Sequence, residues 1–200
     1  MSRITKAELA ILDSLIPKLP QSPVIVDGGG GHGEWTLEVL KRWPEAYVIV
    51  CEPHPMNRAI CCKNLWPNDR ISILPVGLAA TAGEREFWSD SDIRAFGSSL
   101  HRRPHHFETP IMVPCTTLGE LVTPGSWLDF VKLDLEGGEL DAIRGLGNKR
   151  PYHIQFEYGD PWIDAGADIG EAFALLQSYG YTIKTPIPTT TAFENILAER

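Results

Sequence analysis

Residues 24–36 read VIVDGGGGHGEWT and contain four consecutive glycines after an apolar run. The apolar run predicts a buried strand, and the residues that follow Gly33 show helical spacing up to Pro44. The glycines between them allow a tight backbone turn and a close approach to a ligand, which a Cβ atom would prevent. A strand, a glycine-rich turn and a helix in this order predict the first unit of an α/β sheet with a ligand at the turn.

The alternation of apolar and helical segments continues along the chain. Helical spacing predicts helices at 34–43, 55–65, 138–144 and 169–179, and apolar runs predict strands at 46–51, 71–76, 127–135, 153–158, 181–184 and 195–198. Such alternation is typical of a parallel sheet with right-handed crossovers. The link between the last two strands is too short for a parallel crossover, so we expect them to be antiparallel. The predicted fold class is α/β: a doubly wound, mostly parallel seven-stranded sheet with one antiparallel strand near the C-terminus.

Two segments lie outside this alternation. Thr5 and Glu8 have capping-box spacing and begin an N-terminal helix, which we interpret as a packing helix without chemistry. Residues 83–118 hold two strand-like runs around a polar stretch, and we expect an excursion after the third strand, at the ligand-bearing edge of the sheet. A length of 200 residues suits one domain, 1–200, with the N-terminal helix at 1–20 and the core at 21–200.

Composition and charge exclude several classes of protein. The net charge of -8 disfavours broad electrostatic capture of nucleic acid. No apolar run approaches the ~20 residues that span a bilayer, so no membrane partner is expected. The first residues lack the apolar core of a secretory signal. The four cysteines show no CxxC spacing, which favours a reduced, cytoplasmic setting.

The acids near the glycine turn indicate which cofactor it holds. Glu52 ends the second strand, 25 residues after Asp27, where an acid typically accepts hydrogen bonds from both ribose hydroxyls. Asp27 would repel a pyrophosphate but suits a cationic ligand, which favours S-adenosylmethionine. The frame Gly28, Gly30 and Gly33 also fits the dinucleotide pattern GxGxxG, so an NAD-dependent oxidoreductase stays open as an alternative.

Four motifs in order identify a family. They are VDGGGGHG at 26–33, Glu-Pro at 52–53, KLDLEGGE at 132–139, and Glu157 at the end of the following strand. In this order they resemble the FkbM-like methyltransferases, within the Rossmann-like S-adenosylmethionine-dependent enzymes, over roughly residues 24–197. The family usually has Ala-Asn where this chain has two further glycines. The resemblance implies methyl transfer to a hydroxyl oxygen of a small molecule such as a secondary metabolite or a sugar.

The same motifs supply the candidate site residues. The predicted cofactor-binding residues are Asp27, Gly29, Gly31, Gly33, Glu52 and Pro53. The candidate catalytic residues are Asp134, Glu136 and Glu157. A carboxylate among them could accept the hydroxyl proton, or could instead hold the loop to the next helix. Lys132 lies in a strand that should be buried, and we expect a structural ion pair for it.

Metal binding and other functions remain as alternatives. The three candidate catalytic carboxylates could hold a divalent cation, but we do not favour a metal and assign no metal ligands. His101, His105 and His106 fit a polar loop better than a zinc site. A non-catalytic nucleoside-binding module is the second alternative function. Methyl transfer to nitrogen is a narrower alternative, but enzymes that methylate nitrogen often carry an Asn/Asp-Pro-Pro-Tyr segment after the fourth strand, and this chain has Asp134-Leu-Glu136-Gly there. We expect a hydroxylated small molecule as the partner and leave the oligomeric state open.

Overall fold

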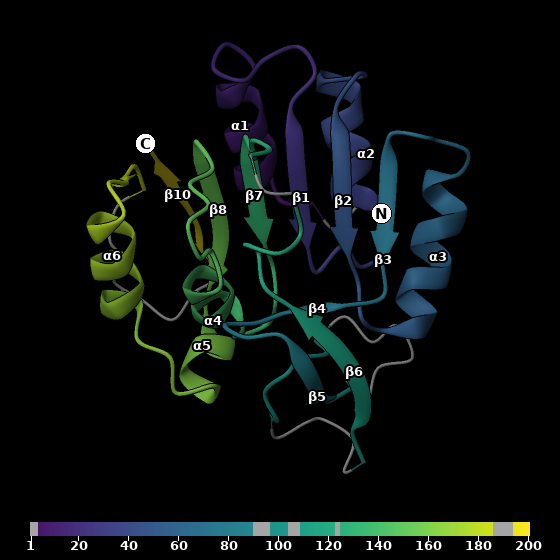
Figure 1. Cartoon of the computed structure of the whole chain (residues 1–200), viewed down its shortest axis with the longest axis vertical. Helices are drawn as coiled ribbons and strands as arrows, with labels where there is room; N and C mark the ends of the chain where they lie inside the picture. Colours follow the sequence, from purple (N-terminus) through teal and green to yellow (C-terminus); the bar gives the residue numbers. More distant parts are fainter. Residues whose placement is uncertain (1–3, 90–96, 104–108, 123–124, 186–193) are drawn as a thin grey trace.

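The computed structural model (Figure 1) describes residues 4–89, 97–103, 109–122, 125–185 and 194–200. Its large sheet has seven strands in the order β3-β2-β1-β7-β8-β10-β9. Only β10 runs antiparallel to its neighbours β8 and β9, and the other pairs are parallel. This confirms the predicted fold class. The strands are β1 (Val24–Gly28), β2 (Tyr47–Cys51), β3 (Ile71–Leu74), β7 (Phe130–Leu133), β8 (His153–Tyr158), β9 (Thr182–Ile183) and β10 (Glu194–Glu199).

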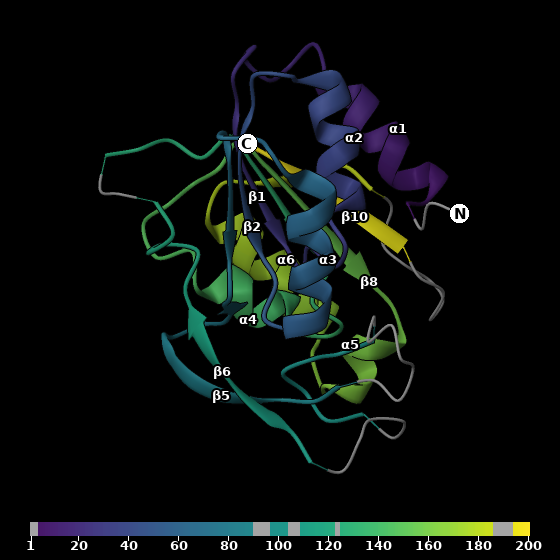
Figure 2. The ribbon, with the colours of Figure 1, turned by 90° about the vertical axis from the view of Figure 1, so that its right-hand side faces the viewer.

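Helices cover both faces of this sheet (Figure 2). Ile25 and Val48 point to one face and pack with α1, α2 and α3, whereas Val26 and Val131 point to the other and pack with α4, α5 and α6. The alternation follows from the period of two along a strand, which makes central strands apolar on both sides. The helices are α1 (Lys6–Leu15), α2 (Glu34–Arg42), α3 (Pro55–Leu65), α4 (Glu139–Arg144), α5 (Asp160–Asp164) and α6 (Ile169–Ser178).

The predicted excursion is a small second sheet. Its strands are β4 (Gly77–Leu78), β5 (Gly83–Phe87) and β6 (Ile111–Thr116), in the order β4-β6-β5. In Figure 1 this sheet lies beyond the arrowheads of β1, β2, β3 and β7, which is the end where a doubly wound sheet binds its ligands. The small sheet has its own core, in which Phe87 packs with Val113.

The differences from the predicted elements are local. The strand expected at 127–135 is shorter, because the chain leaves the sheet after Leu133. Neither β4 nor α5 is predicted, because two and five residues are too few to show a period. The capping box of Thr5 and Glu8 is present in both directions. None of the helices in the described part of the chain combines the length and the hydropathy that a membrane span requires.

Candidate active site

The glycine turn after β1 is held against two neighbouring strands. The N–H groups of Gly29 and Gly30 donate to the carbonyl oxygen of Cys51, at 2.9 and 3.2 Å. Gly29 has φ +76°, and a Cβ atom there would lie 1.9 Å from the carbonyl oxygen of Asp134. Only glycine fits such a position, so the turn lies directly against the loop that follows β7.

Glu52 shapes this turn from the end of β2. Its Oε2 accepts the N–H of Gly31 at 2.8 Å, and its Oε1 accepts the N–H of His54 at 2.8 Å. Burial raises the pKa of Glu52 to about 7, although the two N–H groups favour the charged form. The side chain therefore orders the backbone around the turn while it borders the cavity described below.

Lys132 carries a buried positive charge between two carboxylates. Its Nζ lies 3.1 Å from Oδ2 of Asp134 and 3.6 Å from Oδ1 of Asp27. Burial lowers the pKa of Lys132, but the two carboxylates raise it, and the net shift is upward. The ion pair expected for this lysine is confirmed.

Asp27 lies behind Lys132 and is fully buried. Its Oδ2 accepts the hydroxyl of Thr36 in α2 at 2.7 Å, and burial raises its pKa. Asp27 has the strand parity of Ile25, which packs under the same helices, so its carboxylate points into the layer between sheet and helix. The residue does not border the cavity, whereas the sequence predicts that it contacts the cofactor directly.

The loop after β7 carries two candidate catalytic acids and is tied down by a third acid. Glu139, at the start of α4, accepts the N–H of Leu135 at 2.6 Å and that of Gly137 at 3.0 Å. Burial raises the pKa of Glu139 to about 8. Among the described residues, Glu136 is the one non-glycine with a positive φ, +53°. Glu139, which lies in the KLDLEGGE motif but is not among the predicted site residues, thus anchors this loop.

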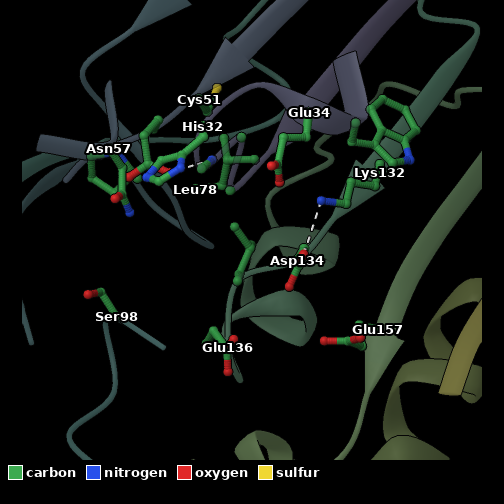
Figure 3. A pocket seen from close by; sticks show the side chains of 18 of the residues that line it. His32, Glu34, Cys51, Asn57, Leu78, Ser98, Lys132, Asp134, Glu136 and Glu157 are labelled. Carbon is green, nitrogen blue, oxygen red and sulfur yellow. Dashed lines mark hydrogen bonds and ion pairs between the residues drawn. The ribbon is translucent and has the colours of Figure 1, made fainter. Parts of the chain in front are cut away.

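Glu157 ends β8 beside this loop. Figure 3 shows the side chains of Asp134, Glu136 and Glu157 around a common space, with Lys132 next to Asp134. Burial raises the pKa of Glu157 to about 8, and the nearby carboxylates of Asp134 and Glu136 act in the same direction. The carboxyl group is therefore poised to exchange a proton near neutral pH.

These residues border one cavity of about 360 Å³ at the carboxyl ends of the strands. Gly33, expected to bind the cofactor, lies outside its lining: it begins α2 with φ +83°, and a Cβ there would lie 3.0 Å from the side chain of Leu65. Of the predicted site residues, the cavity brings together Gly29, Gly31, Glu52, Pro53, Asp134, Glu136 and Glu157.

Two further segments form walls of this cavity, and the sequence predicts only one of them. The excursion, expected at the ligand-bearing edge of the sheet, contributes Phe87, Ser98 and Leu100. The start of α1, interpreted from the sequence as a packing helix, contributes Thr5 and Glu8. The capping box signals where α1 begins, but nothing in the sequence signals that this end of the helix meets the glycine turn.

The described residues hold no group of three or more His, Cys, Asp or Glu side chains arranged to bind a metal ion. The three carboxylates considered for a divalent cation thus do not form such a group. Of the three clustered histidines, His105 and His106 lie outside the described residues.

Comparisons with known proteins point to methyl transfer. A family model described as the methyltransferase FkbM domain matches residues 27–183. The chain is 24% identical to "Methyltransferase sdnD" of Sordaria araneosa over 200 residues, which cover 84% of this chain and 77% of the relative. It is 27% identical to "Trans-aconitate 2-methyltransferase" of Mycobacterium ulcerans over 132 residues, which cover 64% of this chain and 44% of the relative.

Solved structures share the fold at low sequence identity. A putative rRNA methylase from Clostridium thermocellum has a TM-score of 0.61 at 10% identity and covers 98% of this chain and 96% of its own. Precorrin-6y C5,15-methyltransferase from Geobacter metallireducens has a TM-score of 0.53 at 16% identity, covering 98% and 91%. TrmK of M. capricolum, in complex with S-adenosylhomocysteine, has a TM-score of 0.52 at 11% identity, covering 94% and 66%.

Proposed function

Because this chain belongs to the FkbM methyltransferase family and uses S-adenosylmethionine, we propose that it methylates a hydroxyl oxygen of a small molecule. The observation that carries this proposal is Glu157, a cavity carboxyl group whose pKa is raised to about 8. A neutral alcohol must lose a proton as its oxygen attacks, and a carboxylate with such a pKa is a suitable base.

The residues around the glycine turn fit the cofactor. Gly29, Gly30 and Gly31 border the cavity with their backbone. Cβ atoms at Gly29 and Gly30 would lie 1.9 Å from the carbonyl oxygen of Asp134 and 2.1 Å from the side chain of Val50, so only glycine lets the turn lie this close to its neighbours. Glu52 borders the same cavity and has lone pairs left for two ribose hydroxyls after accepting its backbone N–H groups. Pro53 follows Glu52 in the sequence, and we propose that it contacts the adenine ring of the cofactor. Asp27 then acts on the site through Lys132.

The three candidate catalytic acids differ in their partners. Asp134 pairs with Lys132 at 3.1 Å, and Glu136 accepts a hydrogen bond from Nη1 of Arg103 at 2.8 Å. Both pairings tie the carboxylate to a cation. No such cation pairs with Glu157 among the described residues, and we therefore propose Glu157 as the base.

The mechanism relies mainly on positioning. The cofactor, when bound, supplies an electrophilic methyl group on a sulfonium sulfur. The protein holds the acceptor oxygen in line with that methyl group, and Glu157 takes the hydroxyl proton. Orientation of two reactants in one site supplies much of the acceleration in such a reaction. The start of α1 and the excursion form two walls of the cavity in which the reactants are held.

We propose a small molecule rather than a nucleic acid as the acceptor. The likeness in fold to an rRNA methylase suggests RNA as another acceptor. The net charge of -8 and the acids around the cavity disfavour binding of RNA, which is a polyanion. Cys51, Cys61, Cys62 and Cys115 are all free, which supports a cytoplasmic setting. Family membership favours S-adenosylmethionine over the NAD alternative.

The test is a transfer assay with S-adenosylmethionine labelled in its methyl group. The acceptors are matched alcohols, amines and carboxylic acids, together with total RNA. We expect label in an ether that survives treatment with alkali. Label on nitrogen, on carbon or in RNA would contradict the proposed acceptor class, and binding of the cofactor without any transfer would favour a non-catalytic module.

A further inference from the structure

A segment of the excursion, residues 97–103 and here called the strap, lies along the loop that carries the catalytic candidates. Ser99 exchanges two backbone hydrogen bonds with Trp88, at 2.8 and 3.0 Å, so the strap is fastened to the end of β5. The hydroxyl of Ser99 donates to the carbonyl oxygen of Glu136 at 2.8 Å. The strap therefore contacts the acid loop, residues 134–137, as well as its own sheet.

Arg103 ends the strap with a second connection. Its Nη1 donates to Oε2 of Glu136 at 2.8 Å, and its Nε donates to Oδ2 of Asp164 in α5 at 3.1 Å. The arginine side chain is 10% exposed, so solvent screens these ion pairs less than it screens surface pairs. One guanidinium thus joins three segments that are far apart in the sequence.

The residue held in this way has an unfavourable backbone. A glutamate at φ +53° occupies the left-handed region, which non-glycine residues adopt only when their surroundings enforce it. Ser99 binds the carbonyl of Glu136, Arg103 binds its carboxylate, and Glu139 binds the N–H groups on either side. The strap supplies two of these restraints.

The strap also borders the cavity. Ser98 lines it together with Asp134, Glu136 and Glu157 (Figure 3). Leu100 is a further lining residue from the strap. If the strap loosened, the cavity would lose this wall, and the acid loop would lose the contacts that enforce its conformation.

We propose that Arg103 is a positioning residue that locks the strap, the acid loop and α5 into one wall of the active site. This inference rests on the proposed function, because it concerns how that site is assembled. The two ion pairs of Arg103 slow the exchange of ligands through this wall. They also give the carboxylate of Glu136 a structural role.

The test uses S-adenosylhomocysteine as the probe and measures its association and dissociation rates by stopped-flow tryptophan fluorescence. The variants are Arg103→Gln, Arg103→Lys, Glu136→Gln and the double variant Arg103→Gln/Glu136→Gln. Arg144→Gln is the control, because Arg144 also bridges two carboxylates, those of Asp141 and Glu171, and neither of them borders the cavity, whereas Glu136, the partner of Arg103, does. The melting temperature of each variant is recorded.

In Arg103→Gln we expect the association and dissociation rates of S-adenosylhomocysteine to rise by about tenfold, because the charge-assisted hydrogen bonds that hold this wall of the cavity are lost. The dissociation constant changes less than either rate. Arg103→Lys restores part of the effect, and Glu136→Gln reduces the effect of Arg103→Gln in the double variant. A purely structural role would lower the melting temperature without raising the association rate.

Unchanged rates in Arg103→Gln overturn the inference, as does an equal acceleration in Arg144→Gln. If the wild-type protein binds S-adenosylhomocysteine while either of these results is found, only the role of Arg103 fails. If the wild-type protein does not bind S-adenosylhomocysteine, the proposed function fails and the inference fails with it.

Discussion

The carboxylate of Glu52 orders the glycine turn and also faces the cavity. Its sequence position predicts only the second of these roles, contact with a ribose. The structure adds two backbone N–H groups that depend on the same carboxylate. A substitution at this position therefore acts on the turn and on the ligand at once.

We expect Glu52→Ala to weaken binding of S-adenosylmethionine by ~2–3 kcal/mol, because hydrogen bonds to a charged acceptor are lost. The melting temperature should also fall, since the N–H groups of Gly31 and His54 lose their acceptor. Calorimetric titration and thermal unfolding measure the two effects. Unchanged affinity in the folded variant would remove Glu52 from the cofactor site.

Glu157 determines the expected pH dependence. A base must be ionised, and the pKa of this carboxyl group is raised to about 8, so kcat/KM should increase as the pH rises towards 8 and then level off. Glu157→Gln should remove this dependence and lower kcat by ~10²–10⁴ with little change in cofactor affinity.

The amide variants Asp134→Asn and Glu136→Gln serve as comparisons in the same pH-rate measurement. We expect both variants to keep a pH dependence, since Glu157 is intact, but with its midpoint at lower pH, because the charges of Asp134 and Glu136 help to raise the pKa of Glu157. A wild-type profile that is flat between pH 6 and pH 9 (a range of about one to two units around the pKa) would contradict the assignment of Glu157.

Among the elements, β1 and β7 are joined by charge as well as by hydrogen bonds. Asp27 and Lys132 are direct partners in the parallel register of these strands, and both side chains are buried. An uncompensated buried charge is costly, so Asp27 requires Lys132, whereas Lys132 also has Asp134 as a partner. The glycine turn and the acid loop, which follow these strands, are thereby held at a constant separation.

Lys132→Met should destabilise the fold by ~3–5 kcal/mol, because it leaves the carboxylate of Asp27 buried without its cation. The double variant Lys132→Met/Asp27→Asn should recover much of this loss, since the amide can still accept the hydroxyl of Thr36. Denaturant unfolding of the two variants and the wild type measures the difference. Equal stability of the single variant and the wild type would show that the ion pair is not needed.

α1 packs in the same hydrophobic cluster as α2 and α3, through Leu12 and Leu15. This helix lies outside the part of the chain that the family model matches, yet its first residues border the cavity. We therefore propose that residues 1–200 form one domain, in which the N-terminal helix is part of the site rather than an accessory.

At the scale of the whole molecule, binding of the cofactor should increase the free energy of unfolding and the melting temperature. A ligand present at 100 times its dissociation constant stabilises the folded state by ~2.7 kcal/mol. For a chain of this size that corresponds to a rise in melting temperature of about 5–10 °C. We expect this rise with S-adenosylmethionine and S-adenosylhomocysteine but not with NAD or NADP. A larger rise with a dinucleotide would contradict the assignment of the cofactor.

The order of strands, the glycine turn and the family motifs could all be predicted from the sequence. These features depend on local properties: the apolar period of a strand or helix, the positive φ that Gly29 requires, and the length of a connecting link. The antiparallel direction of β10 follows from such a length. Glu52, Asp134, Glu136 and Glu157 could be placed near the site because parallel strands end at the same edge of the sheet.

The separate roles of the acidic residues could be assigned only from the tertiary structure. Asp27 points away from the cavity because successive side chains of a strand point to opposite faces of the sheet. Its carboxylate accepts a hydrogen bond from Thr36 and forms an ion pair with Lys132. The wall built by Arg103 depends on contacts with Glu136 and Asp164, 33 and 61 positions away in the sequence. No period along the chain encodes such contacts, because they arise only when the excursion folds back over the ends of the strands. Local spacing could therefore predict where the site lies, and long-range packing determined which side chains face it.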